Sequence, residues 1–104
     1  MALSIKALAD GQLAGTKGTL YTTPASTQAI IKRITLYNSG AADNTIRLYS
    51  KPGATSRVIY RVVLGTLEHA QYDGEITLEA ADLIEGDATN ANEVDYTISG
   101  AQNA

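Results

Sequence analysis

The sequence of 104 residues contains no cysteine, and this absence removes several kinds of chemistry at once. Without cysteine the chain can form no disulfide bond, no zinc site with thiolate ligands and no thiol nucleophile. There is one histidine, His69, and no GxSxG sequence surrounds a serine, so nothing indicates a hydrolytic triad. We therefore predict a protein that is not an enzyme, with His69 in an exposed loop and no cofactor. A hydrolase is the most remote alternative.

Phenylalanine and tryptophan are also absent, and long apolar runs do not occur. The large apolar side chains are Ile, Leu, Val and Tyr, which suit strands better than helices. No segment of ten or more residues has helical periodicity. No stretch is long enough for a signal peptide or a membrane span, so we expect synthesis in the cytoplasm and no membrane partner.

Lysine and arginine are missing from the second half of the chain. All eight lie within residues 1–61 beside two acids, whereas residues 62–104 hold nine acids and no base. The net charge of −3 argues against a nucleic-acid partner. Two interpretations stay open: the two halves pair within one sandwich, or opposite charges meet between subunits.

Five acids crowd into residues 82–95 without the order of an EF-hand loop. We expect a solvated acidic edge there, and metal binding stays open only as the lesser alternative. The five acids are Asp82, Glu85, Asp87, Glu93 and Asp95.

The most informative stretch is AIIKRITLYN, residues 29–38. Its alternation places apolar side chains on one face of a strand and polar ones on the other, and TIRLYS, residues 45–50, repeats the pattern. With the turn sequence NSGAADN between them, these strands are predicted to be antiparallel neighbours. The predicted core residues are Ile34, Leu36, Ile46 and Leu48. The outward residues Arg33, Tyr37, Arg47 and Tyr49 form a candidate interface, because Tyr and Arg are enriched at binding hot spots; an ordinary solvated sheet face is the alternative.

Turn signals at intervals of roughly ten residues divide the rest of the chain into short strands. Strands are predicted at 3–8, 19–23, 57–65, 75–79, 82–88 and 94–98, and residues 66–72 are ambiguous. We also expect a bulge near Lys32, a hairpin turn at Asp73-Gly74, a strand end at Gly100 and a flexible tail at 101–104. The resulting prediction is one domain, residues 1–104, folded as an all-β antiparallel sandwich of seven to eight strands, of jelly-roll type.

Two long segments together resemble small all-β virion proteins of tailed bacteriophages: LYTTPASTQAIIKRITLYNSGAADNTIRLYSKPGATSRVIYRVVLG and ITLEAADLIEGDATNANEVDYTISG. In that group a short strand leads through a turn with proline into a long strand that ends near Asn. An L-E-A-x-D-x-I-x-G segment then precedes a final Y-T-I-S-G strand. The resemblance covers about residues 18–100. One departure is Ala81, where glycine would suit the turn before Asp82.

The resemblance implies a capsid decoration (cement) protein that binds and stabilises the outside of the phage head. It also implies a homotrimer whose partners are other copies of itself and the shell of major capsid protein, and hence a location in the virion. A tail or spike subunit is the alternative within the same class. A carbohydrate- or host-surface-binding module is the alternative from another class.

Overall fold

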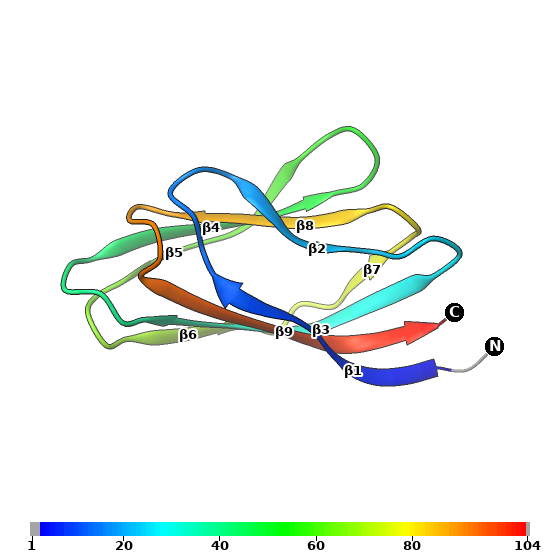
Figure 1. Ribbon diagram of the computed structural model, residues 1–104, viewed down its shortest axis with the longest axis horizontal. Helices are drawn as coiled ribbons and strands as arrows, with labels where there is room; N and C mark the ends of the chain where they lie inside the picture. Colours follow the sequence, from blue (N-terminus) through cyan, green and yellow to red (C-terminus); the bar gives the residue numbers. More distant parts are fainter. Residues whose placement is uncertain (1–2, 104) are drawn as a thin grey trace.

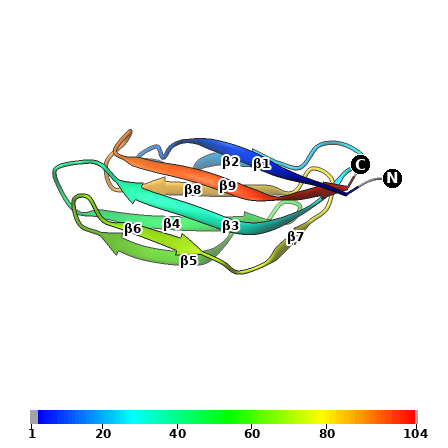
Figure 2. The same cartoon turned by 90° about the horizontal axis from the view of Figure 1, so that it is seen from below.

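The computed structural model describes residues 3–103, with only the backbone of Leu3, Ser4 and Lys6, as two antiparallel sheets packed face to face (Figures 1 and 2). The first sheet has the order β1 (Leu3–Gln12), β9 (Val94–Asn103), β3 (Gln28–Asn38) and β6 (His69–Tyr72), with β7 (Ile76–Leu78) also paired to β3. The second has the order β2 (Gly18–Thr22), β8 (Leu83–Ala88), β4 (Asn44–Lys51) and β5 (Arg57–Leu64). The prediction of an all-β antiparallel sandwich is confirmed.

The core lies between the sheets and is formed by alternate residues of each strand. Ile34 and Leu36 of β3 and Ile46 and Leu48 of β4 all have 0% of their surface exposed, as predicted. Five more apolar residues are also 0% exposed: Leu13, Ile31, Ile84, Val94 and Ile98. At roughly 25 cal/mol per Å² of apolar surface removed from water, such burial is the main stabilising contribution.

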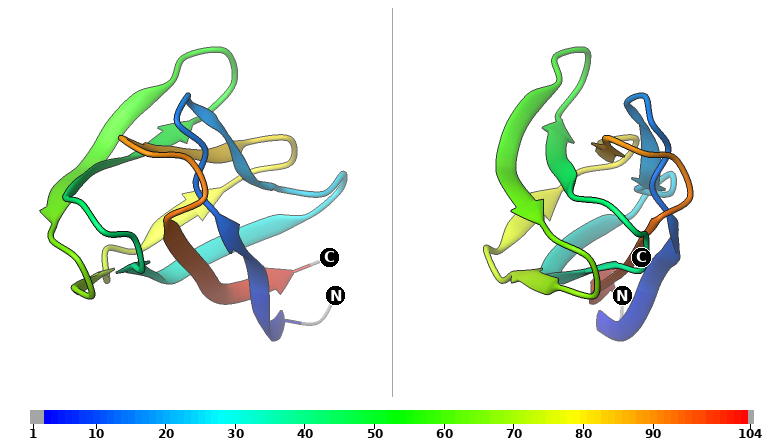
Figure 3. Two further views of the ribbon diagram at one scale, coloured as in Figure 1. Left: turned by 60° about the vertical axis from the view of Figure 1, so that its left-hand side comes forward. Right: turned by 90° about the vertical axis from the view of Figure 1, so that its left-hand side faces the viewer.

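The prediction that β3 and β4 are neighbours in one sheet is wrong. β3 pairs with β9, β6 and β7 in the first sheet, while β4 pairs with β5 and β8 in the second. The turn at 39–43 therefore crosses between sheets (Figure 3). Two strands with one apolar face each can bury those faces by lying opposite one another, so the alternation correctly gave the inward residues but not the neighbours.

An irregularity runs across β3 near Lys32. The register with β9 shifts between Ile31 and Arg33, which confirms the predicted bulge. On the other side of β3, β6 and β7 run in the same direction along its edge and are interrupted at 73–75. Asp73-Gly74 is therefore not a hairpin turn. Lys32 instead forms an ion pair with Glu75, and Arg33 Nε lies 2.6 Å from Asp73 Oδ1.

The last strand is longer than expected, because β9 continues through Gly100 to Asn103. Residues 101–103 are thus strand, not a flexible tail, and Ala104 lies outside the described residues. At Gly100 the backbone of β3 comes so close that a Cβ atom would collide with the carbonyl oxygen of Ile30. Glycine here permits close pairing of two strands and does not mark a strand end.

Candidate functional site

The four residues predicted to form one interface lie on two separate surfaces. Arg33 and Tyr37 are on the outer face of the first sheet, and Arg47 and Tyr49 are on the outer face of the second. The alternation within each strand was predicted correctly. The single candidate interface of four residues does not exist, because it required β3 and β4 to be adjacent in one sheet.

The outer surface of the β4–β5 hairpin, which we call the β4–β5 face, has apolar and basic side chains side by side. Val58 is 57% exposed and Val63 is 50% exposed, although both lie within β5. The ladder places Val58 opposite Tyr49 and Arg61 opposite Arg47. The face therefore consists of Arg47, Tyr49, Val58, Arg61 and Val63.

The charge of this face is not balanced. Arg47 and Arg61 are cross-strand neighbours, an arrangement that is unfavourable for like charges. Asp87 of β8, on the other side of Arg47, has Oδ1 3.8 Å from Arg47 Nη1. Arg61 forms no ion pair among residues 3–103. Since residues 44–64 contain four bases and no acid, this part of the second sheet is strongly basic.

Tyr49 links the face to Asp87. Its hydroxyl donates a hydrogen bond to Asp87 Oδ2 at 2.7 Å, and Lys17 Nζ lies 5.1 Å from the centre of the tyrosine ring. The hydrogen bond to Asp87 raises the pKa of Tyr49, with burial and the negative charge of Asp87 adding to the effect. Tyr49 is therefore fixed in place as a neutral hydrogen-bond donor.

The acids of β8 do not form the solvated edge that the sequence predicted. β8 is a central strand between β2 and β4, and Glu85 and Asp87 are 7% and 9% exposed. Glu85 Oε1 accepts a hydrogen bond from Ser56 Oγ at 2.8 Å. Within residues 3–103 no group of three or more His, Cys, Asp or Glu side chains is arranged to hold a metal ion.

A second charged surface lies at one end of the sandwich, at the left in Figure 1, where the turns at 39–43, 65–68 and 89–93 meet. We call it the acidic end, and it comprises Asp43, Leu67, Glu68, Glu93 and Asp95. These turns contain no lysine or arginine. Leu67, at their tip, is 68% exposed and has a left-handed backbone with φ of 62°.

Two buried asparagines hold the acidic end together, and sequence reasoning missed their role. Asn38 Nδ2 donates to the carbonyl oxygens of Ala42 and Leu64, each at 2.9 Å, and Asn44 Nδ2 donates to Asn38 Oδ1 at 3.1 Å. Asn44 Nδ2 also reaches Glu93 Oε1 at 3.1 Å. The available signal was an Asn at each end of the NSGAADN turn, which we interpreted only as turn chemistry.

Tyr37 borders the acidic end from the outer face of the first sheet. It is 37% exposed and lies between Asp95 of β9 and His69 of β6 in the ladder. His69 is exposed, as predicted, but belongs to a strand and not to a loop. Arg33 lies further along β3 and is engaged with Asp73.

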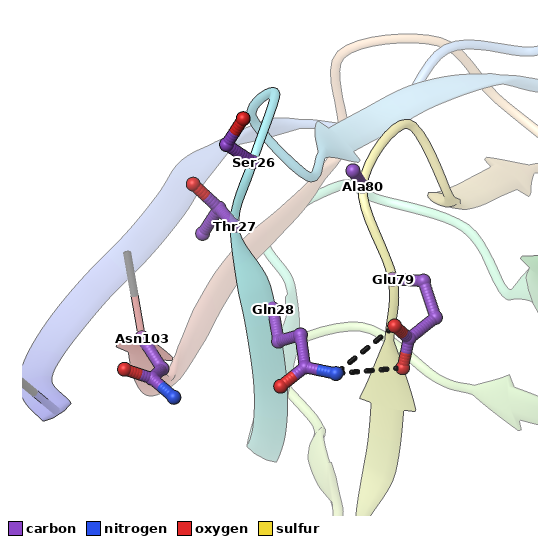
Figure 4. A pocket seen from close by; sticks show the side chains of 6 residues that line it. All are labelled: Ser26, Thr27, Gln28, Glu79, Ala80 and Asn103. Atoms are coloured by element: carbon purple, nitrogen blue, oxygen red, sulfur yellow. Dashed lines mark hydrogen bonds between the residues drawn. The ribbon is translucent and has the colours of Figure 1, made fainter. Parts of the chain in front are cut away.

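One open pocket of about 220 Å³ lies at the opposite end of the sandwich (Figure 4). It is lined by Ser26, Thr27, Gln28, Glu79, Ala80 and Asn103. Gln28 Nε2 donates to both carboxylate oxygens of Glu79, at 3.0 and 3.2 Å. The pocket is smaller than typical ligand sites, and its one carboxylate, Glu79, is engaged by Gln28, so it gives no support for catalysis.

Within the described part of the chain no helix is long and apolar enough to cross a membrane.

Comparison with known proteins gives information on the fold only. No family model matches the chain, and no curated protein matches its sequence. The structure is similar to one described as "Bacillus endospore appendages form a novel family of disulfide-linked pili", with a TM-score of 0.59 and 21% identity, covering 98% of this chain and 88% of that chain. The likeness shows a shared fold.

A more distant similarity is to a pentameric capsid protein isolated from metagenomic phage sequences, with a TM-score of 0.45 and 14% identity. It covers 91% of this chain and 63% of that one. The Gt strain structure of infectious bursal disease virus gives a TM-score of 0.40 at 8% identity, over 97% of this chain and 32% of that one. These two similarities are too distant to support an argument.

Proposed function

We propose that the protein is a non-enzymatic structural subunit of a phage virion, specifically a decoration protein on the outside of the capsid. The observation that supports this most is the β4–β5 face. Two half-exposed valines beside two arginines and a fixed tyrosine have the composition of a protein-binding surface. The resemblance of residues 18–100 to small virion proteins supports the phage capsid as the assembly to which the protein binds.

The strand order supports the same proposal. If β6 and β7 are counted as one interrupted strand, the chain crosses between the sheets at every connection except the β4–β5 hairpin. We infer from this order that the sandwich is a jelly roll, an architecture that occurs among viral capsid proteins and also in lectin domains. Fold alone does not determine function, so this support is secondary.

The mechanism would be stabilisation by mass action. A subunit that binds the assembled shell, and not its separated proteins, shifts the equilibrium toward the shell by an amount that depends on its concentration relative to Kd. Copies of the subunit would form a homotrimer, and the trimer would bind the shell of major capsid protein. Unlike the disulfide-linked pili, copies of this chain cannot be joined through cysteine.

The proposal is tested by quantitative mass spectrometry of virions produced by the genome that encodes the chain. A decoration protein should be present at hundreds of copies per particle. A tail or spike subunit would be present at a few to tens of copies, and absence from the particle would overturn the virion role altogether.

A second measurement addresses the carbohydrate-binding alternative. Sugar-binding sandwiches use flat, exposed aromatic rings, and Tyr37 is the one aromatic residue among residues 3–103 that qualifies as exposed. We expect no binding on a glycan array. Reproducible binding that is lost in Tyr37→Ala would favour the module and contradict decoration.

A further inference from the structure

The chain presents two exposed surfaces of opposite charge, each with an exposed apolar residue at its centre. The β4–β5 face has Val58 and Val63 among the bases, and the acidic end has Leu67 among carboxylates. Asp43 directly precedes β4 and Gly65 directly follows β5, so the acidic end adjoins one end of the β4–β5 face, yet Arg61 forms no ion pair within residues 3–103. We propose that they meet between copies, with the β4–β5 face of one copy against the acidic end of the next.

The charge pattern disfavours a contact of either surface with itself. Such a contact would place Arg61 near Arg61 or Asp43 near Asp43. Like charges in an interface are unfavourable, whereas opposite charges steer the copies together and fix their orientation. Repeating a contact between two different surfaces builds a ring or a filament.

Uncompensated groups on both surfaces point to the same contact. Arg61 faces Arg47 across the ladder, and Asp87 serves as counter-ion only on the far side of Arg47. At the acidic end Glu68 Oε1 accepts a hydrogen bond from Gly65 N, Asp43 Oδ1 lies beside the same glycine, and the surrounding turns contain no lysine or arginine. Each surface supplies the charge that the other lacks.

Leu67 gives a further reason for a contact at this end. Its φ of 62° is costly for a residue with a β-carbon, and its side chain is 68% exposed. At position 67 a glycine would adopt this backbone angle with less strain, and a polar side chain would be better solvated. Burial of this leucine against Val58 and Val63 of another copy offsets both costs.

The test uses charge reversal in the isolated protein. Arg61→Glu and Asp43→Lys each place like charges against each other in the proposed contact, and each should weaken self-association by at least about tenfold at low salt. The double variant Arg61→Glu with Asp43→Lys has both surfaces reversed, so it should regain association to within about threefold of the wild type. Sedimentation velocity across a concentration series measures all three, compared with the 10.9 kDa monomer.

Matched controls separate this contact from effects of net charge. Arg33→Glu makes the same charge change on the first sheet, and Glu79→Lys makes it at the opposite end of the molecule. Both should associate like the wild type, and circular dichroism should show that all variants are folded. Recovery in the double variant confirms the contact, whereas a wild type that stays monomeric, or single variants that associate normally, overturns it. No shell is used, so these results are independent of the copy number that tests the proposed function.

Discussion

Ala81 occupies a backbone conformation that suits glycine. In the turn at 79–82, Asp82 N donates to Glu79 O at 3.0 Å, and Ala81 in the third position has φ of 72°. This is the left-handed region that a type II turn requires at that position. The sequence had indicated glycine there from the resemblance alone, and the backbone angle now gives the physical reason.

Ala81→Gly should therefore stabilise the protein by about 0.5–1 kcal/mol. Removal of the β-carbon relieves about 1–2 kcal/mol of left-handed strain, and the greater freedom of glycine in the unfolded chain cancels part of it. Urea unfolding measures the change. Ala80→Gly, one residue earlier and without a positive φ, should destabilise; equal effects of the two substitutions would contradict the explanation.

Asn38→Ala should destabilise the protein by at least about 2 kcal/mol. It leaves Gly40 N and the carbonyl oxygen of Leu64 without the side-chain amide that they contact, and it removes one acceptor of Asn44 Nδ2, which keeps Glu93 Oε1. An unsatisfied buried polar group costs about 1–3 kcal/mol. The control is Asn90→Ala, which retains the backbone N–H that donates to Asn44 Oδ1 and should change stability by less than about 0.5 kcal/mol.

Tyr49 gives a prediction about pH. Its pKa is raised in the folded protein by Asp87, so its contribution to stability is complete below the unfolded pKa of about 10 and is lost as pH rises through the folded pKa. Asp87→Asn should lower the pKa of Tyr49, which is visible as earlier tyrosinate absorbance.

Asp10→Asn is the control for that titration. Burial is the main cause of the raised pKa of Tyr96, and the charge of Asp10 is secondary. The shift in tyrosinate absorbance should therefore be smaller than in Asp87→Asn. Indistinguishable titration curves for Asp87→Asn and the wild type would show that the hydrogen bond is unimportant.

At the scale of strands, the sequence specified which face of each strand is buried but not which strands are neighbours. Alternation identified Ile34 and Leu36, and separately Ile46 and Leu48, because burial acts on each strand by itself. Pairing depends on whether a turn closes a hairpin or crosses between layers. The buried Asn38–Asn44 contact decides that question at 39–43, and it is a tertiary feature without a local pattern.

The candidate site was affected by the same limitation. The outward arginines and tyrosines were identified, but the partners that determine their roles come from distant strands. Asp87 lies 38 residues beyond Tyr49 in the sequence, and Arg61 joins Arg47 only through the β4–β5 ladder. Strict alternation along residues 57–65 would place Val58 and Val63 on opposite faces of the strand. The bulge between Leu48 and Tyr49 in the β4–β5 pairing brings both to the outer face.

The pairing of β3 with β9 depends on one glycine. Gly100→Ala should destabilise by about 3 kcal/mol or more, because the added methyl group must displace the backbone of Ile30. Gly18→Ala is a suitable control, since its nearest contact would be a comfortable 3.9 Å from Thr16 O. Thermal unfolding of both compares them directly, and a tolerated Gly100→Ala would mean that β3 and β9 separate more easily than the structure indicates.

At the scale of the whole molecule, ion pairs within the subunit use only part of the separated bases and acids. Some pairs form within the subunit, such as Arg33 with Asp73 and Lys32 with Glu75. Others are left over on the β4–β5 face and at the acidic end. The two interpretations that the sequence left open are thus not exclusive, and the second is the one that we propose for assembly.

Self-association should weaken as salt rises from about 0.05 to 0.5 M, where the screening length falls to a few ångströms. The reason is that each exposed ion pair contributes only about 0–1 kcal/mol, so many weak attractions are screened together. Light scattering across this range is the measurement, with a thermal melt of the subunit as control. Association that is unchanged or stronger in high salt would identify an apolar interface. It would also show that the charged side chains are only solvated surface.

The first and last strands also have a practical consequence. Leu3 of β1 pairs with Asn103 of β9, at the end of the 45 Å long axis opposite the acidic end (Figure 1). A peptide or domain joined before β1 or after β9 would leave the sandwich from this one corner, at the end away from the acidic end. If copies assemble as we infer, the particle or filament would display each attached cargo outward at regular intervals, a ready scaffold for multivalent presentation.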